Sequence, residues 1–230
     1  MTADFDHHAE SYGREVNDSV SFTGREVDYF AERKAIHLLD LLGRRLGPPS
    51  SVRALDVGCG VGTTDAHLAG HLGDLAGIDV SADAVAEAAE RNPEVAYRSY
   101  AGDLLPYQDA TFDLAFAVCV LHHVEPPDRA RFTAEMARVV RPGGLVVIFE
   151  HNPFNPLTRV AVSRCEFDDG VELLRRSEAT RLVSGAGVHP VERRYIMFTP
   201  LAGAWSTRID RLARWVPIGG QYYVAGRRAG

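Results

Sequence analysis

An apolar run that ends in three closely spaced glycines constrains the fold of this chain more than any other feature. Residues 52–57 read as a buried strand, and Gly58, Gly60 and Gly62 follow it in a G-x-G-x-G pattern. Glycine lets the backbone turn tightly and approach a ligand at places where any Cβ would collide. The pattern therefore predicts a strand, a ligand-binding turn and the first unit of a parallel sheet.

The residue before this turn restricts the kind of ligand. Asp56 stands two residues before the first glycine. A dinucleotide-binding turn usually reads G-x-G-x-x-G and has an apolar residue at this place, because a carboxylate would repel a pyrophosphate. Both features disfavour a nicotinamide-dependent reductase. A cofactor with a cationic end suits the turn better, and Asp79 provides a second acid where the next strand ends.

Strands and helices alternate along most of the chain. Strands are expected at residues 52–57, 75–79, 95–100, 112–120 and 145–150. Helices are expected at residues 28–42, 63–72, 81–91 and 128–140. Ser81 reads as the N-cap of its helix, and the nearly continuous apolar run from Phe112 is typical of a central parallel strand. This alternation predicts an α/β fold with a parallel sheet and helices on both faces.

Composition excludes several other classes. A chain of 230 residues with 46% hydrophobic content is expected to form a single domain. Its three cysteines show no C-x-x-C spacing, which argues against a disulfide framework or a zinc cluster. No secretory leader or membrane-spanning run is recognisable, so a cytoplasmic protein without a membrane association is expected.

The charge balance bears on partners. The formal net charge is −6, whereas nucleic-acid enzymes are more often basic overall, so no nucleic-acid partner is expected. Residues 1–150 carry 13 Arg and Lys against 24 Asp and Glu, and residues 151–230 carry 12 against 7. The basic second part is more typical of an ordinary solvated face than of a docking surface for an anionic carrier.

Several further motifs resemble one known family. The dipeptide Phe112-Asp113 opens an apolar strand, Leu121-His122-His123-Val124 follows that strand, and residues 138–144 read RVVRPGG. Together with the glycine turn, these landmarks resemble those of class I S-adenosylmethionine-dependent methyltransferases, specifically the small-molecule type 11/12 group. The N-terminal pattern of Phe5, Asp6, Ala9 and Tyr12 is similar to the cofactor-capping segment of that group.

The resemblance implies a domain organisation. It predicts a Rossmann-like seven-stranded, mostly parallel sheet that ends in an antiparallel hairpin, with strands at 191–199 and 221–226. A helix that Ser177 caps and that ends at Ser184 would precede this hairpin. Within a single domain, residues 1–50 would form a helical lid, 51–150 the cofactor-binding core and 151–230 the substrate-facing segment.

The resemblance also implies a cofactor, S-adenosyl-L-methionine, and residues that bind it. Asp56 would lie near the methionine amino end, and Asp79 would accept hydrogen bonds from both ribose hydroxyls. Asp103 would accept from the adenine amino group, with Leu104 against the ring. The other expected cofactor contacts are the backbones of Gly58, Gly60 and Cys119, and the capping residue Tyr12.

Three histidines are candidates for acid-base work. Methyl transfer is an in-line displacement that depends mainly on positioning, and a base is needed only if the acceptor must lose a proton. His122, His123 and His151 sit at or just past two strand ends, and His151 is the preferred base. These histidines, with Glu125 and Glu150, lack His-x-x-x-His spacing and a cluster of Asp and Asn, so no metal site is expected.

The predicted function is the transfer of a methyl group to an O, N or C atom of a small-molecule metabolite, either a secondary metabolite or a sugar. A carrier-bound or sugar-nucleotide substrate and a non-catalytic cofactor-binding module are the alternatives. A monomer and a homodimer are equally compatible with the sequence.

Overall fold

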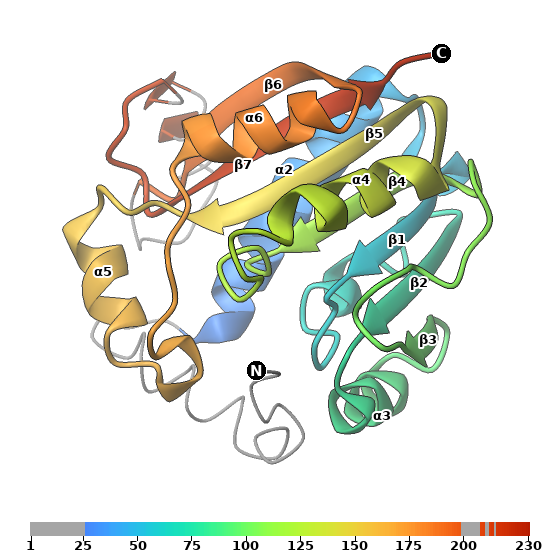
Figure 1. Ribbon diagram of the computed structural model, residues 1–230, viewed down its shortest axis with the longest axis horizontal. Helices are drawn as coiled ribbons and strands as arrows, with labels where there is room; N and C mark the ends of the chain where they lie inside the picture. Colours follow the sequence, from blue (N-terminus) through green and yellow to red (C-terminus); the bar gives the residue numbers. More distant parts are fainter. Residues whose placement is uncertain (1–25, 199–207, 210–211, 214) are drawn as a thin grey trace.

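A seven-stranded sheet with helices on both sides forms the body of the molecule (Figure 1). This computed structural model describes residues 26–198, 208–209, 212–213 and 215–230. The strands are β1 (Arg53–Val57), β2 (Asp74–Asp79), β3 (Ala96–Ser99), β4 (Phe112–Val118), β5 (Val140–His151), β6 (Val188–Ile196) and β7 (Gln221–Arg228). Their order in the sheet is β3-β2-β1-β4-β5-β7-β6. Strands β1 to β5 pair in parallel, and β7 is antiparallel to both β5 and β6. The Rossmann-like fold with its terminal hairpin is confirmed.

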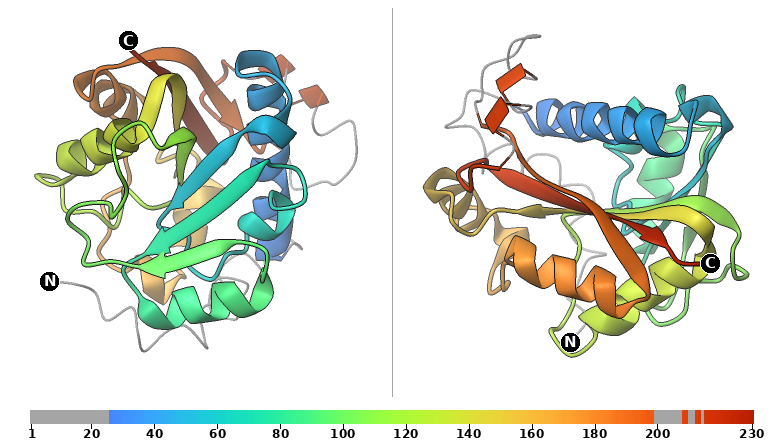
Figure 2. Two further views of the ribbon diagram at one scale, coloured as in Figure 1. Left: turned by 90° about the vertical axis from the view of Figure 1, so that its right-hand side faces the viewer. Right: turned by 90° about the horizontal axis from the view of Figure 1, so that it is seen from above.

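The helices are α2 (Val27–Arg45), α3 (Ala82–Arg91), α4 (Arg129–Val139), α5 (Pro156–Val162) and α6 (Arg176–Gly185). Figure 2 shows α2 on one face of the sheet and α4 with α6 on the other. Short 3-10 turns occur at η3 (Pro49–Ser51), η4 (Asp65–His67) and η5 (Glu166–Asp168). Among the helices of the described residues, none combines the length and apolar character that a membrane crossing requires.

Strand β4 is apolar almost throughout because it is buried on both faces of the sheet. Leu114 and Phe116 are fully buried in the cluster that contains the α2 side chains. Ala115 and Ala117, which point to the opposite face, are fully buried in the cluster that contains α4 and α6. Because successive side chains of a strand alternate between faces, a strand covered on both sides needs apolar residues at every position.

The helix predicted at residues 63–72 is wrong, since only the short turn η4 forms there. Asp65 is fully buried, and its Oδ2 accepts a hydrogen bond from the Tyr97 hydroxyl at 2.8 Å. This tertiary anchor fixes the segment in a tight turn beside Gly62, whose φ is +71°. Helix propensity does not oppose this turn, because the segment contains Thr63, Thr64 and Gly70, which are all weak helix formers.

Other predicted boundaries need smaller corrections. Ser81 caps α3 as expected, because its Oγ accepts from the backbone N–H of Ala84 at 3.2 Å. Ser177 does not cap α6, which begins one residue earlier and has Arg175 at its N-cap without a side-chain bond. The Arg176 guanidinium lies 4.2 Å from the centre of the Tyr195 ring, so a tertiary contact holds this helix start.

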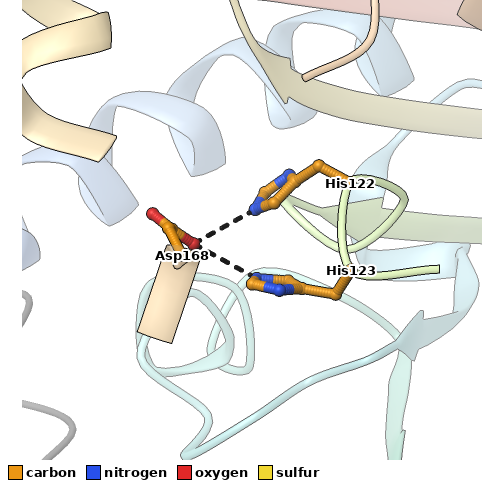
Figure 3. A group of neighbouring side chains, drawn as sticks. All are labelled: His122, His123 and Asp168. Atoms are coloured by element: carbon orange, nitrogen blue, oxygen red, sulfur yellow. Dashed lines mark ion pairs between the residues drawn. The ribbon is translucent and has the colours of Figure 1, made fainter. Parts of the chain in front are cut away.

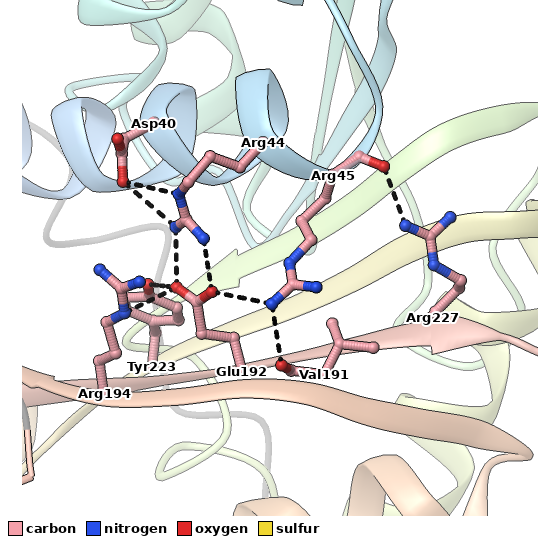
Figure 4. A network of polar contacts seen from close by, with 8 residues as sticks. All are labelled: Asp40, Arg44, Arg45, Val191, Glu192, Arg194, Tyr223 and Arg227. Carbon is pink, nitrogen blue, oxygen red and sulfur yellow. Dashed lines mark hydrogen bonds and ion pairs between the residues drawn. The ribbon is translucent and has the colours of Figure 1, made fainter.

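Helix α2 and strand β5 extend furthest beyond their predicted bounds. Helix α2 continues through Gly43 to Arg45, where its last turn reaches a network of charges on the hairpin (Figure 4). Strand β5 begins at Val140 and not at 145, because Val140 already pairs with Phe112 of β4, and the residues between Val140 and Leu145 form an irregularity in this pairing.

A buried carboxylate at the edge of the hairpin joins α2 to β6. The side chain of Glu192 is 8% exposed, and Arg44 donates to its two oxygens at 2.7 and 2.9 Å. Arg45, Arg194 and the Tyr223 hydroxyl also bond to it (Figure 4). Burial opposes ionisation, but these donors outweigh it and lower the pKa of Glu192 to about 2.

Candidate functional site

The glycine turn after β1 is shaped by two different steric demands. Gly58 has a φ of +81°, and a Cβ built there would lie 2.6 Å from Cγ2 of Val120. Gly60 has a φ of +52°, but a Cβ there would meet nothing within 4 Å. Gly58 is therefore required by close packing against the segment after β4, whereas Gly60 borders open space. Such space beside a tight turn is suitable for a ligand.

Asp79 binds the glycine turn and still has capacity for a ligand. Its Oδ2 accepts from the backbone N–H of Gly60 at 2.8 Å, and its Oδ1 accepts from that of Ser81 at 3.0 Å. Each carboxylate oxygen has two lone-pair sites, so each can accept one more hydrogen bond. This arrangement fits the vicinal hydroxyls of a ribose, the role that the resemblance assigns to Asp79.

Asp56 places an unpaired carboxylate oxygen beneath the turn. The residue is 2% exposed, and its Oδ1 has no hydrogen-bond partner among the described residues. Burial raises the pKa of Asp56 well above its usual value, and Asp65 and Asp79 add to the effect while Lys34 opposes it. A buried oxygen without a donor has a high cost, which a cationic amino group on a ligand would remove. The site therefore fits the cofactor that the resemblance implies.

The loop after β3 carries the two residues expected at the adenine. Asp103 lines the same cavity as Asp56 and Asp79, and its Oδ1 accepts from the backbone N–H of Leu104 at 2.7 Å. The side chain of Leu104 is 63% exposed and does not line the cavity. Their roles at the cofactor stay predictions, as does that of Tyr12, which lies outside the described residues.

Cys119, directly after β4, has an unusual backbone conformation. Its φ is +57°, a left-handed value that costs a non-glycine residue about 1–3 kcal/mol. Its N–H donates to the Phe149 carbonyl at 2.9 Å, and its Sγ accepts from Nε2 of Gln221 at 3.6 Å. Strain of this kind concentrates at functional sites, and here it turns the chain from the strand into the histidine loop.

These groups surround one cavity of about 1030 Å³ at the carboxyl ends of β1, β2, β4 and β5. Binding sites of open α/β sheets are found at this edge. Small-molecule sites commonly measure about 300–1000 Å³, so this cavity has room for a cofactor and a second small molecule. The predicted residues that line it are Asp56, Gly58, Gly60, Asp79, Asp103, Cys119, His122, His123 and His151.

The three histidines also come together, but they differ in environment. His122 is 3% exposed, and its Nδ1 lies 2.7 Å from Oε2 of Glu150. Its Nε2 lies 3.4 Å from Oδ1 of Asp168, and Nε2 of His123 lies 3.3 Å from the same oxygen (Figure 3). Burial by itself lowers the pKa of His122, but the two carboxylates outweigh it and raise the pKa to about 10.

His123 and His151 shift in the opposite direction. Burial lowers the pKa of His123, although Asp168 opposes the change. Burial and then the charge on His122 lower the pKa of His151 to about 4, so its ring is neutral at pH 7. Its Nδ1 lies 3.3 Å from Nε2 of Gln221. A neutral ring can take a proton, so the directions of these pKa shifts favour His151 over His122 as a proton acceptor.

Three site residues were not identified from the sequence. Asp168 comes from the long segment after β5, Gln221 begins β7, and Lys34 is a buried cation on α2 that lines the cavity. The Asp-Asp-Gly triplet at 168–170 signals only a turn. Nothing in the local sequence of Gln221 or Lys34 distinguishes them, because their roles depend on contacts with distant residues.

Comparisons with known proteins agree with this geometry. The family described as Methyltransferase domain matches residues 55–148. The demethylmenaquinone methyltransferase of Beutenbergia cavernae is 31% identical over 182 residues, which cover 72% of this chain and 73% of that protein. The 2-methyl-6-phytyl-1,4-hydroquinone methyltransferase of Synechocystis is 36% identical over 108 residues, which cover 45% of this chain but only 33% of that protein.

A solved structure extends the likeness in fold beyond the matched segment. A geranyl diphosphate methyltransferase in complex with S-adenosylmethionine superposes with a TM-score of 0.61 at 20% identity, covering 86% of this chain and 85% of that one. The glycine turn, the acids that end β1 and β2, the strand order and the relatives all point to the same conclusion. The chain belongs to the class I S-adenosylmethionine-dependent methyltransferases.

Proposed function

We propose that this enzyme methylates a small aromatic or otherwise apolar metabolite that carries an ionisable hydroxyl, at the oxygen or at a carbon that the hydroxyl activates. The observation that carries this proposal is the wall of the cavity opposite the glycine turn. Side chains of α5, η5 and the residues after β6 give this wall a large apolar part, formed by Leu157, Ala161, Phe167, Met197 and Phe198. Polar side chains such as Asn155 and Asp168 lie on the same cavity. The apolar part offers contact area to the face of a ring, so the wall favours an apolar ring over the sugar alternative.

The acids and the glycine turn would hold the cofactor. Asp79 would accept from the ribose, Asp56 would pair with the methionine amino group, and Gly60 would leave room for both. The bound cofactor supplies an electrophilic methyl group. The chain's own contribution is to hold the acceptor in line with that methyl group and to receive any proton that the acceptor loses.

His151 is the proposed proton acceptor, positioned by Gln221. Oε1 of Gln221 is buried and has no hydrogen-bond partner among the described residues, whereas its Nε2 faces Nδ1 of His151. The oxygen and nitrogen of an amide are assigned by the surrounding bonds and can be exchanged. With the amide turned over, Oε1 accepts from Nδ1–H of His151, and the contact with Cys119 becomes one in which the thiol donates to Oε1. Nε2 of the His151 ring can then take a proton.

The relatives agree with a ring-bearing acceptor. The names of the two relatives describe the methylation of a phytyl hydroquinone and of demethylmenaquinone. The first name denotes a hydroquinone with a phytyl substituent, and the second denotes a quinone. The proposal carries over only this class of acceptor and not the individual compounds.

The test is methyl transfer from cofactor labelled with a deuterated methyl group. Purified protein is incubated with hydroquinones and phenols of increasing size, and with sugars of matched mass, and products are identified by mass spectrometry. We expect a labelled product from the phenolic series only. Transfer to the sugars, with none to any phenol, would overturn the proposed acceptor class but not the family.

A further inference from the structure

We propose that His122, His123 and Asp168 form a binding site for a tetrahedral divalent metal ion of the zinc type, at the acceptor side of the cavity. The two histidines follow β4, and Asp168 reaches them from η5 (Figure 3). One ligand atom from each side chain lies within 4.8 Å of the others. The sequence lacks His-x-x-x-His spacing and a cluster of Asp and Asn, which predicted no metal site, but neither pattern detects ligands that are far apart along the chain, as His122 and Asp168 are.

The distances distinguish this group from an ordinary hydrogen-bonded cluster. Nε2 of His122 and Nε2 of His123 lie 3.4 and 3.3 Å from Oδ1 of Asp168. Charge-assisted hydrogen bonds are shorter, about 2.7–2.9 Å, and the contact of His122 with Glu150 shows that value at 2.7 Å. Two ligands bound at about 2.0–2.1 Å to a tetrahedral zinc ion lie about 3.3–3.4 Å apart. Both separations therefore match ligands that share one ion.

A second observation points to the same ligand. The His122 side chain is 1% exposed, and its Nε2 has no hydrogen-bond partner among the described residues. Its Nδ1 bonds to Glu150, which is fully buried and also accepts from the backbone N–H of Leu121 at 2.8 Å. A carboxylate on one ring nitrogen orients the other nitrogen toward a metal, an arrangement common at histidine ligands. Glu150 thus acts as the outer partner of His122.

The local charges balance with a divalent cation. Asp168 and Glu150 place two carboxylates around the rings of His122 and His123. When both rings are neutral, as metal binding requires, a divalent ion compensates both charges. A single proton on His122 would compensate only one, and a protonated ion-pair cluster is the alternative that the experiment below tests.

Three protein ligands leave one position open for water or substrate, as at catalytic zinc sites. All three ligands line the cavity, so this position would face it. Resting on the proposed function, we assign the open position to the acceptor hydroxyl. A hydroxyl oxygen bound to the ion loses its proton more readily; that proton passes to His151 or to water, and the oxygen keeps its electron pair for attack or for activation of the ring.

The experiment measures metal binding directly. Protein freed of metal by a chelator is titrated with Zn²⁺ by calorimetry and with Co²⁺ by visible absorption, because tetrahedral Co²⁺ gives intense bands. We expect one ion per chain and a tetrahedral Co²⁺ spectrum. Asp168→Asn and His123→Ala should abolish both signals, and Glu150→Gln should weaken affinity about 10–100-fold.

Asp169→Asn is the matched control, since it removes the neighbouring acid and should bind Zn²⁺ like the wild type. Should a ligand variant fold poorly, the rise in melting temperature of the wild-type protein with Zn²⁺ concentration gives an independent measure. Absence of stoichiometric binding by the wild type, or binding unchanged in both ligand variants, would overturn the site and leave an ion-pair cluster. Zn²⁺ binding without transfer to any phenol would retain the site and reject only the acceptor.

Discussion

The cofactor side and the acceptor side of the cavity are built in different ways. The cofactor side uses residues of two neighbouring strands: Asp56 lies in β1, the glycine turn follows that strand, and Asp79 at the end of β2 accepts from the N–H of Gly60. The acceptor side joins residues from the loop after β4, from η5 and from β7, such as His122, Asp168 and Gln221. A cofactor side built on backbone geometry can go on binding the same cofactor. An acceptor side built from side chains of distant segments can change its substrate while the sheet stays the same.

The largest effect is expected on the acceptor side, at His151. If it accepts the proton, His151→Ala should lower turnover about 10²–10⁴-fold and leave cofactor affinity nearly unchanged. His189→Ala, which removes an exposed imidazole on β6, is the control. Turnover is measured by product formation and cofactor affinity by calorimetry. Near-wild-type turnover would mean that positioning alone carries the catalysis on this side.

A smaller effect is expected on the cofactor side, where the variant should change cofactor affinity. Asp79→Ala should weaken cofactor binding by about 1.5–3 kcal/mol, because it removes a charged acceptor from the ribose and from the N–H of Gly60. Glu90→Ala, an exposed acid on α3, should bind like the wild type. Calorimetric titration of both variants decides the point, and equal affinities would remove Asp79 from the cofactor site.

A pair of glycine variants sharpens the description of the turn. Gly58→Ala should destabilise the fold by about 1–3 kcal/mol because its Cβ would overlap Val120, in addition to about 1–2 kcal/mol for its left-handed backbone. Gly60→Ala meets no neighbour and should cost only about 1–2 kcal/mol for its left-handed backbone. Chemical denaturation compares the two. A larger loss for Gly60→Ala would contradict the steric distinction.

The smallest effect is expected away from both sides, at Glu192. Its arginine partners are partly exposed and screened, so Glu192→Gln should cost about 1 kcal/mol at neutral pH. The folded pKa of about 2 lies below the reference value of 4.5. The contribution is therefore complete above pH 4.5 and is lost as the pH falls from 4.5 toward 2. Denaturation of both proteins across this range should show their difference shrink, and a constant difference would argue against the ionised network.

Features that depend on neighbouring residues could be predicted from the sequence, whereas contacts between distant residues could not. The Ser81 cap and strand β4, apart from its last two predicted residues, were identified correctly because a capping serine and an apolar run act within a few residues. The strand ends at Val118 because Cys119 has a left-handed backbone. The helix at 63–72 was wrong because the bond of Asp65 to Tyr97 spans 32 positions. The three histidines were identified individually, but Asp168 was missed, since its partners lie 45 and 46 residues earlier.

The contact of Gly58 with Val120 has a consequence for variation in this enzyme. Val120 stands two residues before His122, so the two sides of the cavity share a wall at this contact. A side chain at 58 would displace the histidine loop unless position 120 became smaller at the same time, and even then the left-handed backbone of Gly58 would oppose it. A smaller residue at 120, chosen to enlarge the acceptor pocket, should also remove packing that supports the cofactor turn.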